Sequence, residues 1–108
     1  MMRSVFLLLG ALAVGCGGAS GATCPTDSTL TYDNFGRQFF ASYCDSCHTT
    51  GTRPSLSTLA QIRAESTAID LAAAAGPSSV NTSMPESGTV PSEAERLRLG
   101  EWLACGAR

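Results

Sequence analysis

The feature that most constrains this 108-residue chain is a pair of cysteines, Cys44 and Cys47, followed directly by its single histidine, His48. Aromatic residues make up only 6% of the sequence. We therefore expect that side-chain burial alone stabilises so small a chain poorly. Domains of this size usually need disulfides, a metal ion or a bound cofactor as well. The two thiols and the imidazole indicate where such a group is held.

The N-terminus has the pattern of an export signal. Residues 5–14 form an apolar run that follows Arg3 and is too short to span a bilayer as a helix. The segment Ala13-Val-Gly-Cys16 resembles a bacterial lipobox, in which the signal is cleaved before a cysteine that then carries lipid. We expect residues 1–15 to be a signal peptide of the lipoprotein type and Cys16 to be the lipidation site. The alternative is ordinary secretion with loss of Cys16.

Export would place the chain on the periplasmic side of a bacterial membrane, where cysteines meet oxidising conditions. The net charge is −2 and the sequence has no lysine, which argues against binding to nucleic acid or to anionic lipid. Small and polar residues over 16–31 predict a tether, flexible over 17–22, and an N-terminal loop. A single domain is expected over 32–108.

Helical periodicity and the absence of any β-strand pattern predict an all-α domain. Aromatic residues at helical spacing predict a first helix over 32–45, with Thr31 as its N-cap. A second helix is expected to begin after Ser57, its N-cap. It is expected to end at Gly76, which is followed by a proline.

A long loop is predicted between the second helix and a third one. Residues 77–91 contain three prolines and no periodicity, and loops of this length in small domains usually carry function. Ser92 and Glu95 predict a capping box at the start of the third helix, and Gly106 is expected to close it. The apolar face of this helix is formed by Leu99, Trp102 and Leu103.

The sequence Cys44-Asp-Ser-Cys47-His48 is the attachment motif of c-type haem. Two thiols three residues apart reach both vinyl groups on one porphyrin edge, and the next residue brings an imidazole to the iron. One alternative is a C-x-x-C redox pair, which would need strands that the sequence does not predict. Another is half of a zinc site, which would need four ligands. We expect one haem c, held through Cys44 and Cys47, with His48 as an axial ligand.

A haem that only transfers electrons needs a second axial ligand, and Met84 is the one methionine that remains after export. It follows His48 by 36 residues and lies in the predicted loop, which is long enough to fold over the opposite face of the ring. A thioether ligand stabilises reduced iron and raises the reduction potential. The alternative is that Met84 fills a gap in the core, as most methionines do.

Over residues 32–106 the chain resembles a class I cytochrome c of the small bacterial type, with one haem. Besides the haem motif, Gly36 and Phe40 stand eight and four residues before its first cysteine, as in the first helix of that family. Leu99 and Trp102 match the residues of the family's last helix that pack on that glycine and phenylalanine. The resemblance implies the cytochrome c fold, with three main helices around a covalently bound haem.

The resemblance also implies roles for two prolines. Met84-Pro85 ahead of a capped helix is the family's arrangement. Pro54 and Leu56 match its Gly-Pro-x-Leu segment, in which the proline carbonyl accepts a hydrogen bond from the ligand histidine and fixes its orientation. Arg53 stands where the family has the glycine.

Two glycines have a physical interpretation. Gly36 lacks a side chain and lets the first and third helices cross closely, and we expect Gly100 to lie at the same contact. The alternative is that each glycine is merely tolerated in its helix.

Cys24 and Cys105 remain once Cys16 is assigned to lipid and two cysteines to haem. In an oxidising compartment this pair is a candidate disulfide, and the fold that the resemblance implies brings the first and last helices into contact. The family does not require this bond. The alternative is two free thiols.

The resemblance implies a one-electron carrier and not an enzyme, because His48 and Met84 together leave the iron no open position. We expect redox protein partners, a membrane attachment through lipid at Cys16, no nucleic acid, and a monomer. The lysine ring by which many relatives dock is not available here. Two alternatives stay open. One is a haem enzyme or gas sensor in which Met84 is displaceable, and the other is a disulfide-stapled lipoprotein adaptor without haem.

Overall fold

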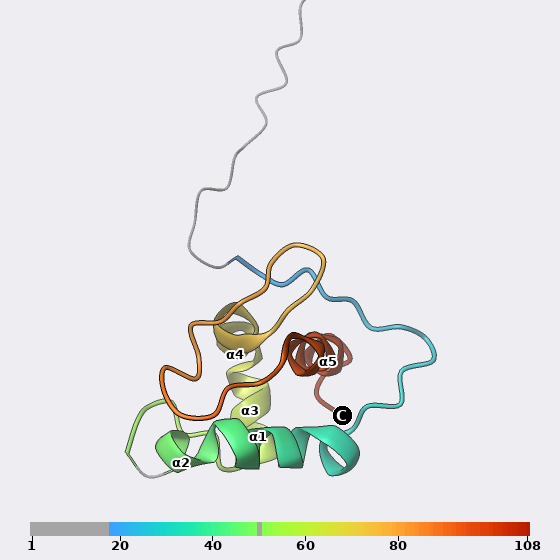
Figure 1. The fold of residues 1–108 in the computed structure, drawn as a ribbon. Helices are drawn as coiled ribbons and strands as arrows, with labels where there is room; N and C mark the ends of the chain where they lie inside the picture. The colour runs from blue at the N-terminus through green and yellow to red at the C-terminus, as the bar shows by residue number, and fades with distance from the viewer. Residues whose placement is uncertain (1–17, 50) are drawn as a thin grey trace, which may run out of the picture.

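The computed structural model describes residues 18–49 and 51–108. The predicted signal peptide and Cys16 lie outside these residues. In the described part the structure is mostly helical and has no strand, which agrees with the all-α prediction, and Ala75 and Val80 form an isolated β-bridge. None of the described helices has the length and apolar character needed to cross a membrane. The elements are η1 (Tyr32–Gly36), α1 (Arg37–Tyr43), α2 (Asp45–His48), α3 (Leu59–Ala64), α4 (Ser66–Ala73) and α5 (Glu93–Ala104) (Figure 1).

The first predicted helix is present and reaches His48, three residues beyond the predicted end. Thr31 is its N-cap, as predicted: the Thr31 hydroxyl accepts from the Asn34 N–H at 3.1 Å, and the Asn34 side chain accepts from the Thr31 N–H at 2.7 Å. The first turn is wider than an α-helical turn, because the Gly36 N–H donates to the Thr31 carbonyl five residues back. The helix is interrupted at Cys44, where φ is −122°.

The predicted cap of the second helix is wrong by one residue. Thr58, not Ser57, is the N-cap, because its hydroxyl accepts from the Gln61 N–H while the Gln61 side chain accepts from the Thr58 N–H. Ser57 donates to the same Gln61 side chain from its own N–H and hydroxyl, both at 2.9 Å. Ser57 therefore supports the cap from outside the helix.

The second helix is also shorter than predicted and is divided in two at Glu65, where φ is −104° and ψ is 15°. It ends at Ala73 and not at Gly76. The chain becomes extended at Ala74 because the carbonyls of Ala73 and Ala74 accept from groups outside the helix, namely from Arg96 and Asn81. Gly76 lies beyond this end.

Residues 77–91 form no helix, as predicted. The predicted capping box of α5 is confirmed: the Ser92 hydroxyl accepts from the Glu95 N–H, and the Glu95 carboxylate accepts from the Ser92 N–H, both at 3.1 Å. After α5 the chain turns at Gly106, which has a φ of +84°. A glycine is favoured there because side chains strain this backbone conformation.

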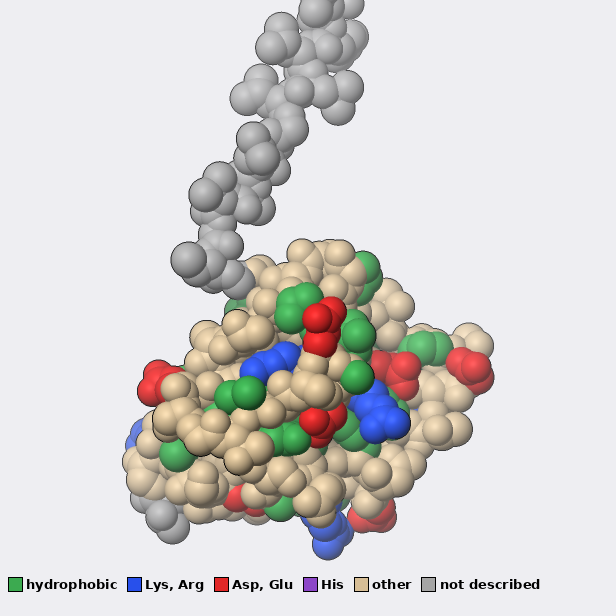
Figure 2. Space-filling model, viewed as in Figure 1, with side chains coloured by type: hydrophobic (Ala, Val, Ile, Leu, Met, Phe, Trp, Pro, Cys, Tyr) green, Lys and Arg blue, Asp and Glu red, His purple; other side chains and the backbone are tan. Residues whose placement is uncertain are grey.

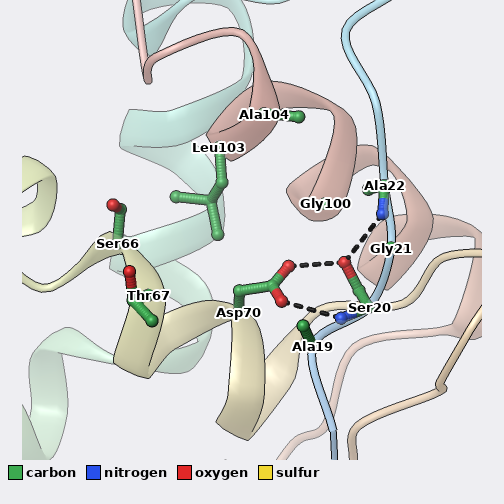
Figure 3. A pocket seen from close by; sticks show the side chains of 10 residues that line it. All are labelled: Ala19, Ser20, Gly21, Ala22, Ser66, Thr67, Asp70, Gly100, Leu103 and Ala104. Atoms are coloured by element: carbon green, nitrogen blue, oxygen red, sulfur yellow. Dashed lines mark hydrogen bonds between the residues drawn. The ribbon is translucent and has the colours of Figure 1, made fainter.

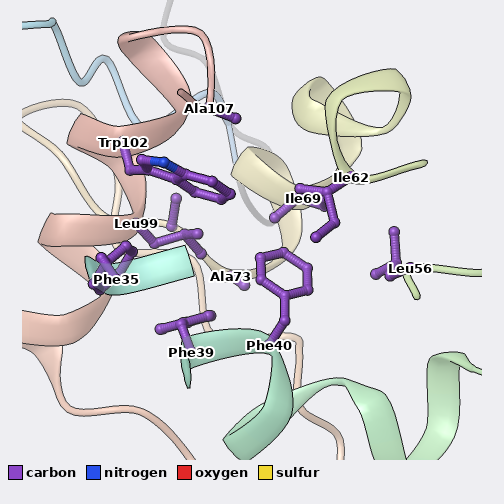
Figure 4. Packing of buried hydrophobic residues seen from close by; sticks show 11 residues of the cluster. Phe35, Phe39, Phe40, Leu56, Ile62, Ile69, Ala73, Leu99, Trp102 and Ala107 are labelled. Carbon is purple, nitrogen blue, oxygen red and sulfur yellow. The ribbon is translucent and has the colours of Figure 1, made fainter. Parts of the chain in front are cut away.

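The core is built around α5. Leu99 and Trp102 are fully buried, and the Trp102 ring packs edge-on against Phe35 and Phe40, with centroids 6.1 and 6.2 Å apart. Figure 4 shows these side chains converging on the space between α5, the first helical segment and α4. The cluster contains Phe35, Phe39, Phe40, Leu56, Ile62, Ile69, Ala73, Ala74, Leu99, Trp102 and Ala107.

The two glycines have different roles. A Cβ on Gly36 would lie 2.6 Å from Cζ2 of Trp102, so Gly36 does permit the predicted close crossing with α5. The expectation that Gly100 shares this contact is wrong. A Cβ on Gly100 would instead meet the carbonyl oxygen of Ala75 and the side chain of Ala22, so Gly100 admits other parts of the chain.

The segment before η1 packs against the helices. Ser20 is buried, and its N–H and hydroxyl donate to the two carboxylate oxygens of Asp70 on α4 (Figure 3). Its carbonyl accepts from the Ser78 N–H at 2.8 Å. The prediction of a flexible tether over 17–22 is therefore wrong for Ser20 to Ala22, because hydrogen bonds and the space at Gly100 hold this segment.

Candidate functional site

A cavity of about 280 Å³ gathers the residues that the sequence predicts to hold haem. It is bordered at the end of the first helical segment by Cys44, Cys47 and His48. It is also bordered by Met84, which belongs to the loop over residues 77–91. Its apolar wall includes Phe40, Leu56, Ile69 and Ala73. The structure thus brings together residues that are 36 positions apart in the sequence.

The single turn of α2 arranges the motif. The Cys44 carbonyl accepts from the N–H of Cys47 at 3.2 Å and from that of His48 at 3.0 Å, which closes the single turn of α2. Residues three and four positions apart in a helical turn share one face. The two thiols and the imidazole therefore lie together at the cavity.

The His48 ring is oriented by Pro54. Nδ1 of His48 lies 2.8 Å from the Pro54 carbonyl oxygen, the contact that the family resemblance implies. A carbonyl only accepts, so Nδ1 carries the hydrogen and donates it. In the neutral ring Nε2 then keeps a free electron pair, which is the form that binds a metal.

Cys44 and Cys47 are free thiols in the structure, and they differ in exposure. Cys47 is exposed, whereas Cys44 is half-buried. Burial, with a smaller effect from the charge of Asp45, raises the pKa of Cys44 to about 12. This direction is opposite to that of the thiolate in reactive C-x-x-C pairs, whose pKa is lowered.

Met84 is half-buried and packs against the core cluster. Both of its backbone polar groups have partners: the N–H donates to the Ala72 carbonyl at 3.0 Å, and the carbonyl accepts from Nη1 of Arg96 at 2.8 Å. Met84 therefore occupies a fixed place in the loop although it belongs to no helix.

Cys24 and Cys105 lie at disulfide distance, with Cα atoms 4.8 Å apart. Cys24 belongs to the segment before η1, and Cys105 caps the end of α5. The pair lies apart from the residues that line the cavity. The pair joins the segment before η1 to the end of α5.

A hydrogen bond beside the cavity was not predicted from the sequence. The Tyr43 hydroxyl donates to the Glu95 carboxylate at 2.7 Å, and this bond raises the pKa of Tyr43. The pKa of Glu95 is lowered, first by the hydrogen bond from the Ser92 N–H and then by the one from Tyr43. Tyr43 directly precedes Cys44. Its position next to the motif was the only feature of the sequence that could have pointed to Tyr43.

Arg96 was also missed. It is 4% exposed, and Nη1 donates to three backbone carbonyls, one of them that of Met84. The available signal was its position three residues before Leu99, which places a cation on the apolar face of α5.

Among the residues that the structure describes, no three His, Cys, Asp or Glu side chains are grouped to hold a metal ion. The cavity instead has two possible iron ligands, the imidazole of His48 and the thioether of Met84, and methionine is not one of those four residue types. Comparison with protein families, with curated proteins and with solved structures finds no match to this chain.

Proposed function

We propose that this chain is a one-electron carrier, a monohaem c-type cytochrome with the cytochrome c fold. In this proposal Cys44 and Cys47 hold one haem covalently, and His48 and Met84 ligate its iron. The observation that carries the proposal is that all four residues line one cavity, although Met84 comes from a distant loop.

The residues present suit such a group. The cavity wall is mainly apolar, as expected for a site that excludes water from a porphyrin. Nδ1 of His48 donates its hydrogen to the Pro54 carbonyl. The electron pair of Nε2 is therefore free to bind the iron. When bound, the haem supplies an iron that changes reversibly between Fe(III) and Fe(II).

Two firm ligands favour electron transfer over catalysis. The backbone of Met84 is held by hydrogen bonds at both its N–H and its carbonyl, which resists displacement of its sulfur. A haem enzyme or gas sensor would need that sulfur to leave. We therefore rank the electron carrier above this alternative.

The partners we propose are redox proteins on the periplasmic side of a bacterial membrane. The chain would be a monomer, attached to this membrane by lipid at Cys16. Figure 2 shows acidic and basic side chains scattered among polar ones on the face in view, without a broad area of one sign. With no lysine in the chain, recognition would depend on single Arg, Asp and Glu side chains near the haem edge.

A pyridine haemochrome assay tests the proposal directly. The full chain is produced in a periplasm with a haem-attachment system, beside Cys44→Ser/Cys47→Ser and the matched Cys24→Ser/Cys105→Ser. We expect covalent haem in the wild type and in the Cys24/Cys105 variant and none in the Cys44/Cys47 variant. Colourless wild-type protein would refute the proposal and favour an adaptor without haem.

The oxidised protein distinguishes the two haem-containing alternatives. A methionine sulfur gives oxidised haem c a weak long-wavelength absorption band. We expect this band in the wild type. A coloured protein that lacks it would favour the enzyme or sensor.

A further inference from the structure

Arg96 is a cation in a place where charge is unfavourable. It is 4% exposed, and burial lowers the pKa of its guanidinium group, although arginine remains charged because its pKa starts above about 12. In the described part of the chain the one salt bridge joins Arg37 to Asp33 and does not involve Arg96. A buried cation without a carboxylate needs other oxygen partners.

Those partners are backbone carbonyls from two segments. Nη1 of Arg96 donates to the carbonyls of Ala73 at 3.0 Å, Asn81 at 2.9 Å and Met84 at 2.8 Å. Ala73 is the last residue of α4, where carbonyls lack helical partners and carry partial negative charge. Asn81 and Met84 belong to the loop that follows. One nitrogen atom thus connects α5, the end of α4 and the loop.

The same loop is held to α4 from the other side. The Met84 N–H donates to the Ala72 carbonyl at 3.0 Å, and the Ser83 hydroxyl donates to that carbonyl at 3.1 Å. Met84 is therefore hydrogen-bonded to α4 through its N–H and to α5 through its carbonyl. Met84, held at these two anchors, packs against the core cluster and lines the cavity that His48 also borders.

We propose that Arg96 is a positioning residue, which fixes the backbone of Met84 and thereby strengthens its sulfur as an iron ligand. This inference rests on the proposed function. Loss of the guanidinium group frees the loop at Asn81 and Met84. The packing of Leu99 and Trp102 remains, and the hydrogen bond to the Ala72 carbonyl is then the backbone contact that still holds Met84. This bond opens more often without Arg96, so the loop loosens before the domain unfolds.

The test compares Arg96→Gln with Arg98→Gln, which changes an exposed arginine on the same helix, in the haem-loaded full chain. Added imidazole competes with Met84 for the iron. We expect Arg96→Gln to raise the apparent imidazole affinity about tenfold, as loss of hydrogen bonds from a charged group would. Exchange of the Met84 amide hydrogen should accelerate by a similar factor. Arg98→Gln should change neither quantity.

A purely structural role predicts a different result. Arg96→Gln would then lower the denaturation midpoint but leave imidazole affinity and Met84 amide exchange as in the wild type, and this result would overturn the inference. If Arg96→Gln does not fold, Arg96→Lys keeps the charge but ends one bond short of Nη1. We expect a rise of about threefold in imidazole affinity there, and an unchanged affinity would overturn the inference.

The failure of the proposed function is recognised separately. Wild-type protein that is colourless, or coloured without the long-wavelength band, refutes ligation by Met84 and with it any role of Arg96 in that ligation. Wild-type protein with the band, together with Arg96 variants that leave imidazole affinity unchanged, refutes only the positioning role.

Discussion

Nδ1 of His48 and the carbonyl oxygen of Pro54 lie 2.8 Å apart. The contact spans a short loop that also returns the Leu56 N–H to the His48 carbonyl at 2.7 Å. One short segment thus fixes both the backbone and the ring of His48. Under the proposed function, this is the arrangement that holds a ligand histidine in one orientation.

This contact predicts which ring nitrogen of His48 carries the hydrogen. In the reduced, haem-loaded protein we expect Nδ1 of His48 to carry a slowly exchanging hydrogen and Nε2 to carry none. Nitrogen-15 NMR of the ring distinguishes the two nitrogens. A hydrogen on Nε2, or rapid exchange at Nδ1, would contradict both the contact and the ligand role.

Met84→Ala removes the thioether from the cavity. We expect the long-wavelength band to disappear, the reduction potential to fall and the iron to bind added imidazole, because a sulfur ligand favours reduced iron and blocks the sixth position. Redox titration and absorption spectra measure these changes. Val90→Ala, at an exposed loop position outside the cavity lining, should leave all three properties unchanged.

Removal of the Cys24–Cys105 bond should destabilise the fold without loss of haem. The two residues are 81 positions apart, and a loop of this length contributes about 4 kcal/mol at most by restricting the unfolded chain. We expect Cys24→Ser/Cys105→Ser to shift urea denaturation to lower concentration. Loss of covalent haem in this variant would show that the assignment of the cysteines is wrong.

The Tyr43–Glu95 hydrogen bond should make stability depend on pH. The pKa of Glu95 is lowered in the folded state, first by the Ser92 N–H and then by Tyr43. The carboxylate therefore adds stability above its ordinary pKa of 4.5, and this stability is lost as the pH falls through the lowered value. The pKa of Tyr43 is raised, so its contribution is present below pH 10 and is lost as the pH rises through the raised value.

Tyr43→Phe removes this bond. We expect a lower urea midpoint than in the wild type at pH 7, and a smaller difference at pH values below about 4.5. Tyr32→Phe, which removes a hydroxyl from the first turn of the same helical segment, is the matched control. A difference for Tyr43→Phe that is equal at pH 3 and pH 7 would rule out the carboxylate as the partner that matters.

Gly36→Ala should be destabilising although alanine favours helices. An added Cβ would lie 2.6 Å from Cζ2 of Trp102, and overpacking of this kind costs about 1–3 kcal/mol. Gly18→Ala is the control, because a Cβ there meets nothing within 4 Å. Denaturation curves measure both variants, and a more stable Gly36→Ala would show that the crossing has room to spare.

The local features of the fold were predictable from the sequence because local residues determine them. Thr31 and Ser92 cap their helices through residues three positions away, and that spacing is visible in the chain. The cap at Thr58 was missed although the same spacing marks it, because Gln61 stands three residues after Thr58 whereas Ala60 stands three residues after Ser57.

Features set by distant contacts were not predictable. Gly100 meets Ala75 and Ala22, which helical periodicity could not relate to it. Arg96 is buried because the carbonyls of one helix end and one loop converge on it, and nothing in the sequence marks those carbonyls. The predicted haem-site residues do meet at one cavity, because the motif itself specified most of them.

If Cys16 carries lipid, as proposed, the packing of Ser20 against Asp70 would limit how far the domain stands from a membrane. Ser20 lies four residue steps from this lipid anchor. The Gly18 carbonyl, which accepts from Nδ2 of Asn81 at 2.8 Å, lies only two steps from it, a reach of at most about 7 Å when fully extended. The domain would then lie close to the bilayer with a restricted range of orientations. Such a short linker would restrict electron exchange to donors and acceptors that are embedded in that membrane or lie on it.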